Sequence, residues 1–219
     1  MLEAVIFDMD GVLIDSEPFH LVVNEKIFAN LGINLSEEEY HSFIGTTHKD
    51  MWSTIKKRYN LPQSVPELVN MQVSGNIDYI KNEEIEPIKI KGVTDLLFKI
   101  AQENIKIGIA SSSPTEVIEL VINKLGISNY FSAIVGGEEI KKGKPSPDIF
   151  LKAAKRLNSK PSDCIVIEDS KNGVLAAKTA GMKCVGFKNP NSGKQDLGKA
   201  DLIVENYDSL NVSTLKNLF

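Results

Sequence analysis

Short runs of consecutive apolar residues, many of them β-branched, are the feature of this sequence that most limits its fold. Such unbroken runs are typical of strands buried on both faces, as in parallel sheets. The segments between most of them carry helix signals, such as the Ser146-Pro147-Asp148 start of an apolar stripe. The sequence therefore predicts an α/β protein with a doubly wound, Rossmann-like parallel sheet. The predicted strands cover residues 3–8, 105–111, 133–136, 164–168, 183–187 and 201–204.

The stretch from residue 16 to residue 87 breaks this alternation. It shows no convincing strand pattern, and about 70 residues are far too many for a loop between two strands. We therefore expect an inserted α-helical cap domain over residues 16–87, a discontinuous α/β core over 1–15 and 88–219, and a hinge near 13–16 and 86–91. The helices predicted in the insert cover 17–31, a segment from the capping box at Ser36 to Gly45, about 48–58, and 64–82.

The helix expected after the second strand begins with Ser113-Pro114-Thr115-Glu116. Ser113 is predicted to be its N-cap, Pro114 its first residue and Glu116 the second half of a capping box. Gly126 is predicted to end the helix. The free N–H groups of its first turn would then face the end of the second strand.

The composition excludes several classes of protein. With 42% hydrophobic and 25% charged residues, the 219-residue chain is expected to fold as one large domain or as a domain with an insert. No apolar run approaches the ~18–20 residues of a membrane span and no secretory signal is visible, so we expect a cytoplasmic protein. The net charge of -4 gives no reason to expect nucleic-acid or membrane partners. Cys164 and Cys184 are expected to be buried, reduced thiols, and the sequence gives no indication of oligomeric state.

Polar residues follow four of the predicted strands at the points where the strands end. Doubly wound sheets bind ligands beyond the carboxyl ends of their strands, so we expect these side chains to meet at one edge. Each alone is typical of a surface charge or a helix cap, but their joint appearance at four strand ends favours a functional site. They are Asp8 and Asp10 after the first strand, Ser111 and Ser112 after the second, Lys144 after the third, and Glu168 and Asp169 after the fourth.

This edge would hold four carboxylates against the single Lys144. Two like charges ~4 Å apart cost roughly 4 kcal/mol at an effective dielectric constant of 20, so the carboxylates should raise their own pKa values or recruit a cation. A ligand set made of oxygen atoms favours Mg²⁺. A divalent ion would also supply the positive charge that an anionic substrate requires.

The same edge offers a site for a phosphate group. Ser111 and Ser112 precede the free N–H groups of a helix, and Lys144 adds a positive charge. A phosphoryl group bound there would face Asp8, whose carboxylate could attack phosphorus and form an aspartyl-phosphate. Asp10 could protonate the leaving alcohol and then deprotonate the water that hydrolyses the intermediate.

The ordered set of these residues resembles the four motifs of the haloacid dehalogenase superfamily of phosphohydrolases, in the subgroup with a helical cap after the first strand. The motifs are Asp8-x-Asp10-Gly11, the strand that ends in Ser111, Lys144-Pro145, and Glu168-Asp169 followed by Gly173. The resemblance implies that Asp8 is the nucleophile and Asp10 the acid and base. It also implies ligands for Mg²⁺, namely Asp8, the Asp10 carbonyl, Glu168 and Asp169, and for phosphate, namely Ser111, Ser112 and Lys144.

Within the superfamily, residues 7–18 are similar to those of sugar- and polyol-phosphate phosphatases and of β-phosphoglucomutase. The mutase holds the second phosphate of a bisphosphate intermediate with an arginine and a lysine of its cap. Here His48 aligns with the arginine and residues 60–80 contain no lysine or arginine, which favours a phosphatase, although Lys49 could substitute. The candidate substrate residues of the cap are Glu17, His20, Thr46, His48 and Lys49, and Trp52 is expected to pack in the cap rather than to face the substrate.

Other classes of protein fit the sequence less well. A receiver-type signalling domain needs no cap, and its phosphoacceptor would end the third strand, which here ends in Gly136-Gly137. A P-loop kinase would have serine or threonine where Pro145 follows Lys144, and no G-x-G-x-x-G follows the first strand as in dinucleotide-binding enzymes. An inactive binding protein of the same fold is disfavoured by the intact set of motifs.

We therefore expect a Mg²⁺-dependent phosphatase that hydrolyses a small sugar or polyol phosphate monoester through an aspartyl-phosphate. A mutase of the β-phosphoglucomutase type is the alternative. The cap should close over the site, exclude bulk water and select the small phosphorylated metabolite.

Overall fold

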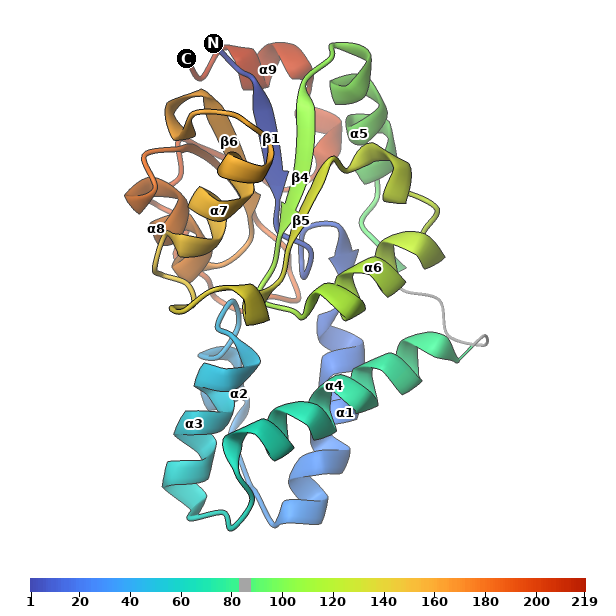
Figure 1. The fold of residues 1–219 in the computed structure, drawn as a ribbon, viewed down its shortest axis with the longest axis vertical. Coiled ribbons are helices and arrows are strands. Elements are labelled where there is room, and N and C mark those ends of the chain that lie inside the picture. The colour runs from blue at the N-terminus through green and yellow to red at the C-terminus, as the bar shows by residue number, and fades with distance from the viewer. Residues whose placement is uncertain (83–87) are drawn as a thin grey trace.

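Six parallel strands form the central sheet, in the order β5-β4-β1-β6-β7-β8. The structure is a computed structural model that describes residues 1–82 and 88–219, and of Glu37 the backbone alone. All six predicted strands are present, which confirms the α/β fold with a doubly wound sheet (Figure 1). The strands are β1 (Ala4–Phe7), β4 (Lys106–Ala110), β5 (Ala133–Val135), β6 (Cys164–Glu168), β7 (Lys183–Phe187) and β8 (Leu202–Val204).

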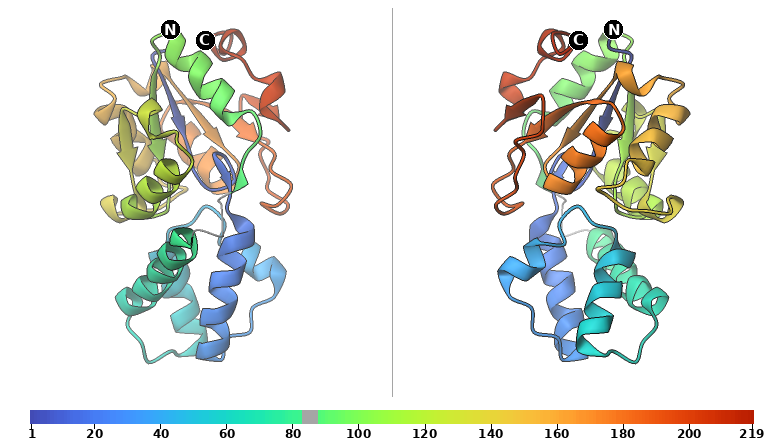
Figure 2. Two further views of the ribbon diagram at one scale, coloured as in Figure 1. Left: turned by 90° about the vertical axis from the view of Figure 1, so that its right-hand side faces the viewer. Right: turned by 90° about the vertical axis from the view of Figure 1, so that its left-hand side faces the viewer.

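Helices cover both faces of this sheet, and the central strand β1 therefore buries every one of its side chains. Val5 and Phe7 belong to an apolar cluster with residues of α5, α6 and α9, and Ala4 and Ile6 belong to a second cluster with residues of α7 and α8. Successive strand residues point to opposite faces, so a central strand requires an unbroken apolar run. The helices, seen from two sides in Figure 2, are α5 (Val93–Gln102), α6 (Thr115–Lys124), α7 (Asp148–Arg156), α8 (Lys171–Thr179) and α9 (Val212–Lys216).

The start of α6 differs from the prediction. Pro114 takes the cap position and the helix begins at Thr115. Ser113 is not the N-cap, because its hydroxyl donates to Asp10 Oδ2 at 2.8 Å. The Thr115 N–H donates instead to the Glu138 carboxylate at 3.0 Å, and no capping box involving Glu116 forms. A serine that the sequence presents as a helix cap therefore belongs to the surroundings of Asp10.

Four helices pack on one another at one end of the core and form what we call the helical module, residues 17–81 (Figure 1). Trp52 is fully buried in its apolar interior, edge-on to Phe28, and its Nε1–H donates to Gln72 Oε1 at 2.8 Å. This burial confirms the predicted packing role of Trp52. The helices are α1 (Glu17–Leu31), α2 (Glu37–His41), α3 (His48–Tyr59) and α4 (Val65–Lys81), close to the predicted bounds except for the end of α2.

Helix α2 is shorter than expected. Ser36 caps it as predicted, with its Oγ accepting a hydrogen bond from the Glu39 N–H at 3.2 Å. The helix ends at His41 and not at Gly45, because the Ser42 hydroxyl donates to the Glu39 carbonyl and competes with the next helical turn. The chain then turns at Gly45, which has a φ of 77° that favours glycine.

A pair of short antiparallel strands connects the helical module to the core. They are β2 (Ile14–Asp15) and β3 (Ile88–Lys89), and they were not predicted because two residues give no periodicity. Both lie within the expected hinge segments, although Glu86 falls outside the described residues. The division into a core over 1–15 and 88–219 and a cap over 16–87 stays a prediction.

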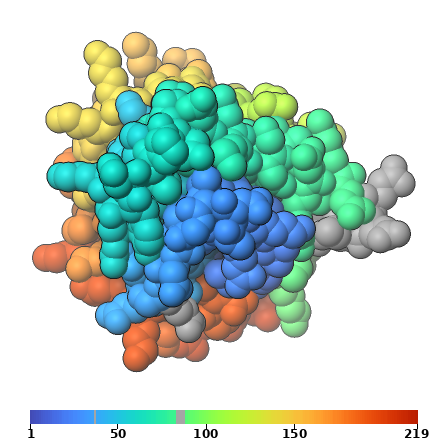
Figure 3. Space-filling view, turned by 90° about the horizontal axis from the view of Figure 1, so that it is seen from below, coloured from blue at the N-terminus to red at the C-terminus, as the bar shows by residue number. Residues whose placement is uncertain are grey.

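Hydrogen bonds also bridge the module and the core. Lys124 on α6 donates to the carbonyls of Ile80 and Asn82 at the end of α4, at 2.7 and 2.9 Å. The Ser112 hydroxyl donates to the Gly45 carbonyl at 3.1 Å. Seen from below, the module lies over this end of the core (Figure 3). The two parts are therefore held together around the loops that follow the strands.

The two cysteines lie in the interior of the core. Cys164 and Cys184 are free thiols, as expected, and burial raises the pKa of Cys164 to about 11. Such thiols are unreactive at neutral pH. Within residues 1–82 and 88–219, no helix combines the length and the hydropathy that a membrane span requires.

Candidate active site at the carboxyl edge of the sheet

The first strand places Asp8 and Asp10 at the edge of the sheet that faces the helical module, where both line a cavity. Asp8 follows β1 directly, and its N–H donates to the Ile167 carbonyl of β6 at 3.0 Å. The chain then turns at Gly11, with a φ of 74°. A Cβ at Gly11 would overlap the Asp169 carboxylate, so both the backbone conformation and the space require glycine.

Three buried carboxylates, from Asp8, Glu168 and Asp169, form what we call the acidic group, with one oxygen of each within 4.8 Å of the others. Lys144 Nζ lies 2.6 Å from Asp8 Oδ1 and 2.6 Å from Glu168 Oε1. Burial raises the pKa of Asp8 to about 8 and also raises the pKa of Asp169. Burial alone would lower the pKa of Lys144, but the two carboxylates hold it above its usual value. The single positive charge of Lys144 does not neutralise three carboxylates.

The acidic group fits a magnesium ion by its chemistry, because carboxylate oxygens are the ligands that this ion prefers. Asp8 and Asp169 face the cavity. Glu168 lies behind them, with its Oε2 accepting a hydrogen bond from the Ser170 N–H at 2.7 Å. The Asp10 carboxylate is not part of the group, and the predicted use of its main-chain carbonyl as a ligand stays a prediction.

Asp10 has surroundings that differ sharply from those of Asp8. His20 Nε2 lies 3.1 Å from its Oδ1, and the hydroxyls of Ser111 and Ser113 donate to its Oδ2 at 3.2 and 2.8 Å. Burial alone would raise the pKa of Asp10, but the hydrogen bond and the charge of His20 lower it well below its usual range. Two carboxyls only two residues apart therefore favour opposite protonation states.

The predicted phosphate-binding residues lie at the same edge but have partners within the protein. Ser111 Oγ accepts from the Ser113 N–H at 3.0 Å, and both Ser111 and Ser112 line the cavity. The Ser112 hydroxyl is directed to the Gly45 carbonyl of the module. Lys144 lies behind the cavity wall, between Asp8 and Glu168. The structure thus brings the strand-end residues together, as the sequence predicted, without testing their roles.

The cavity between core and module has a volume of about 80 Å³. Of the predicted cap residues, Glu17, His20, Thr46 and His48 line it. Burial raises the pKa of Glu17 to about 7 and lowers the pKa of His48 to about 4. Lys49 is the exception, because the first turn of α3 directs it outward to a neighbouring cavity of about 350 Å³ that shares Thr47, His48 and Ser112 with the first.

Several residues of the site were not predicted from the sequence. Ser192 donates to Asp169 Oδ2, and Asn189 donates to the Gly11 carbonyl at 3.0 Å. Both follow β7. The end of this fifth strand carries polar residues, as do the four strand ends from which the site was predicted. On the module side, the unpredicted lining residues include Asn24, Tyr40 and Gln72. Their spacing along α1, α2 and α4 gives no signal that distinguishes them from ordinary packing residues.

Comparison with known proteins agrees with this geometry. A family model described as Haloacid dehalogenase-like hydrolase matches residues 5–187. The chain is 33% identical to a β-phosphoglucomutase of Bacillus subtilis over 98% of this chain and 94% of that protein. It is 32% identical to hexitol phosphatase B of Escherichia coli K12 over 83% of this chain and 82% of that protein.

A solved structure shows the same fold over the full length. The crystal structure of a β-phosphoglucomutase from Clostridium difficile superposes with a TM-score of 0.87 at 32% identity, covering 100% of this chain and 97% of that one. The family match also spans the strand ends that carry Asp8, Ser111, Lys144 and Glu168. The chain therefore belongs to the haloacid dehalogenase-like hydrolases and is an enzyme of that family.

Proposed function

We propose that this enzyme is a Mg²⁺-dependent phosphatase that hydrolyses a small sugar or polyol phosphate monoester. Its family and relatives support a phosphatase or phosphomutase role. The observation that carries the proposal is the contrast between two carboxyls that line one cavity. Asp8 lies in the acidic group beside Lys144, whereas Asp10 lies apart from it, held by His20 and Ser113.

The first step is attack on phosphorus by a carboxylate oxygen of Asp8. The new oxygen–phosphorus bond forms as the bond to the leaving oxygen breaks, and Asp10 gives a proton to that oxygen. For this step Asp10 must take up a proton against the effect of His20, which favours its ionised form. The positive charge of Lys144 opposes the effect of burial on the pKa of Asp8 and so favours the carboxylate form that this step requires. A magnesium ion held by Asp8, Glu168 and Asp169 would neutralise charge on the phosphoryl oxygens.

The second step is hydrolysis of the aspartyl-phosphate. Asp10, now a carboxylate, accepts a proton from water as the water oxygen attacks phosphorus, and Asp8 leaves as a carboxylate. Asp10 ends the cycle protonated, as it began. The contacts from His20, Ser111 and Ser113 favour the ionised form of Asp10, which is the form this step requires.

The test is a phosphate-release panel of hexose, pentose, polyol and nucleotide monophosphates, with and without EDTA. We expect turnover of at least one sugar or polyol phosphate, its loss in EDTA and its recovery with Mg²⁺. Full activity in the chelator would contradict the metal assignment, and release from no member of the panel would contradict the phosphatase.

A phosphomutase is the second candidate, because the 33% identity to a β-phosphoglucomutase extends over 98% of this chain. Against it, no lysine or arginine is among the described residues that line the cavity, where a second phosphate would need one. A coupled assay for conversion of β-glucose 1-phosphate to glucose 6-phosphate distinguishes the two. Isomerisation faster than phosphate release would favour the mutase.

A further inference from the structure

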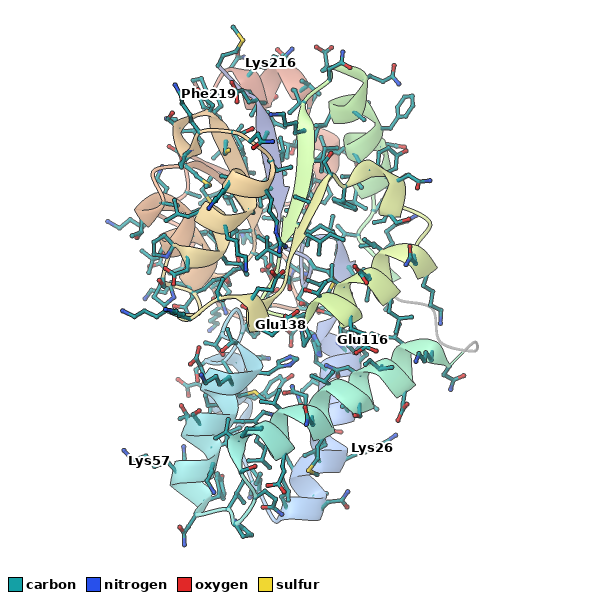
Figure 4. All side chains as sticks on the ribbon, viewed as in Figure 1. Lys26, Lys57, Glu116, Glu138, Lys216 and Phe219 are labelled. Carbon is teal, nitrogen blue, oxygen red and sulfur yellow. The ribbon has the colours of Figure 1, made fainter. Side chains whose placement is uncertain are left out.

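The wall of the cavity that the helical module contributes is polar but carries no lysine or arginine among the described residues. Its side chains offer carboxyl, amide, hydroxyl and imidazole groups. Lys26 and Lys57 of the module are exposed and project outward from opposite sides of the module (Figure 4). A ligand that enters the cavity from the phosphate site therefore meets hydrogen-bonding groups and no fixed lysine or arginine charge.

A directed chain of hydrogen bonds runs through the module to this wall. Trp52 Nε1–H donates to Gln72 Oε1 at 2.8 Å, and Gln72 Nε2 donates to Asn24 Oδ1 at 3.0 Å. Asn24 Nδ2 donates in turn to the Tyr40 hydroxyl oxygen at 3.1 Å. Because Tyr40 accepts this bond, its own proton is free to be donated, and no described residue accepts it.

Tyr40 keeps that proton. Burial raises the pKa of Tyr40 well above its usual range, and the charge of Glu17 adds to the effect. Tyr40 lines the cavity, and the indole of Trp52, fixed in the module core, anchors the chain of amides that leads to it. The result is a hydrogen-bond donor whose orientation is set by the amides of Asn24 and Gln72 and by the indole of Trp52.

Two other residues that line the cavity carry a polar atom without a partner. Glu17 Oε2 and His48 Nδ1 are buried and have no hydrogen-bond partner among the described residues. An unpaired buried polar atom is unfavourable, so such atoms are normally satisfied by water or by a ligand. Alcohol hydroxyls both donate and accept, and they match a wall that presents a phenol, a carboxyl and an imidazole.

We infer that Tyr40, Glu17 and His48 bind hydroxyl groups of the leaving alcohol and so select monophosphates of neutral sugars or polyols over bisphosphates. This inference rests on the proposed phosphatase function and names the part of the substrate that the module recognises. A second phosphate at this wall would be buried beside the Glu17 carboxyl without a lysine or arginine partner, which is unfavourable. A leaving group without hydroxyls would leave the three groups unpaired.

The first test compares Tyr40→Phe with wild type on sorbitol 6-phosphate and on p-nitrophenyl phosphate, whose leaving group has no alcohol hydroxyl beyond the ester. We expect kcat/KM to fall about threefold to tenfold more for sorbitol 6-phosphate, the loss expected for one neutral hydrogen bond. Tyr79→Phe is the matched control, because Tyr79 is in the module but does not line the cavity, and the ratio should not change. Equal effects of Tyr40→Phe on both substrates would overturn the inference.

The second test needs no variant and therefore does not depend on folding. Wild-type enzyme is given fructose 6-phosphate and fructose 1,6-bisphosphate, and we expect a kcat/KM at least about tenfold lower for the bisphosphate. A bisphosphate that reacts as well as the monophosphate would overturn the inference. If the enzyme hydrolyses p-nitrophenyl phosphate but shows neither preference, the inference alone fails. If it releases phosphate from none of these compounds, the proposed function fails as well.

Discussion

The two walls of the cavity, one from the sheet and one from the helical module, are built on different principles. The sheet wall gathers charged groups, with Asp8 and Asp169 clustered in it and Lys144 paired with Asp8 from behind. The module wall offers hydrogen-bonding side chains such as Tyr40 and Gln72, supported by a buried indole. In the proposed mechanism, the sheet wall carries the steps common to phosphate esters and the module wall recognises the leaving group.

The difference also lies in what fixes the side chains. On the sheet wall, Asp8, Ser111 and Asp169 directly follow strands whose backbone hydrogen bonds set their positions, as for Asp8 beside Ile167. On the module wall, positions depend on how α1, α2 and α4 pack around Trp52. Changes to the sheet wall should therefore act on catalysis, and changes to the module should act first on stability and substrate choice.

The largest effect is expected from Asp8→Asn. The amide cannot attack phosphorus, so phosphate release should fall at least about a thousandfold. The protein should stay folded, because asparagine has nearly the same shape as aspartate and its carbonyl oxygen can still accept the hydrogen bond from Lys144. Release from the best substrate of the panel and far-UV circular dichroism measure both. Asp95→Asn, on the exposed side of α5, is the control, and appreciable turnover by Asp8→Asn would contradict the nucleophile assignment.

On the module side, Trp52→Ala should reduce stability rather than chemistry. Loss of a fully buried indole costs about 3–5 kcal/mol in the free energy of unfolding, more than the ~1 kcal/mol of its hydrogen bond to Gln72. Urea unfolding measures the change. Trp52→Phe keeps most of the buried ring and should cost much less. A loss below about 1 kcal/mol for the alanine variant would show that the module does not depend on this packing.

The sequence predicted the sheet wall more completely than the module wall. Unbroken apolar runs identified all six strands of the sheet, and topology then brought Asp8, Ser111, Lys144 and Glu168 to one edge. The error at Ser113 arose because a serine before a helix has the same local pattern whether it caps the helix or donates to Asp10. Only the distant partner, more than a hundred residues away, decides between them.

The module could be predicted as helices but not as a binding surface. Apolar spacing located α1, α3 and α4, and Trp52 was correctly placed in their core. Lys49 was named as a candidate contact, but α3 turns it away from the cavity next to Asp8. Tyr40 was missed, because the direction of a side chain on a five-residue helix depends on packing that no local pattern specifies.

Glu17→Gln should change how stability depends on pH. The folded protein holds the pKa of Glu17 at about 7, above the 4.5 of the free side chain, because the group is buried. The wild type therefore loses stability as pH rises from about 4.5 to about 7, up to roughly 3 kcal/mol, and the neutral glutamine removes that loss. Thermal unfolding between pH 4 and pH 8.5 measures it. If the difference between variant and wild type does not grow with pH, Glu17 is not a buried carboxyl.

The smallest effect is expected from Ser112→Ala, which removes a hydrogen bond between the two walls. The Ser112 hydroxyl donates to the Gly45 carbonyl, and a neutral bond of this kind contributes about 0.5–1.5 kcal/mol. Without it, backbone amides near residue 45 should exchange hydrogen for deuterium about threefold to tenfold faster. Ser42→Ala is the control, because its hydroxyl bonds to the Glu39 carbonyl within the module. Equal acceleration in both variants would mean that the loop is loosened locally. Faster exchange in Ser112→Ala alone would show that a predicted phosphate-binding residue of the core also holds the module in place.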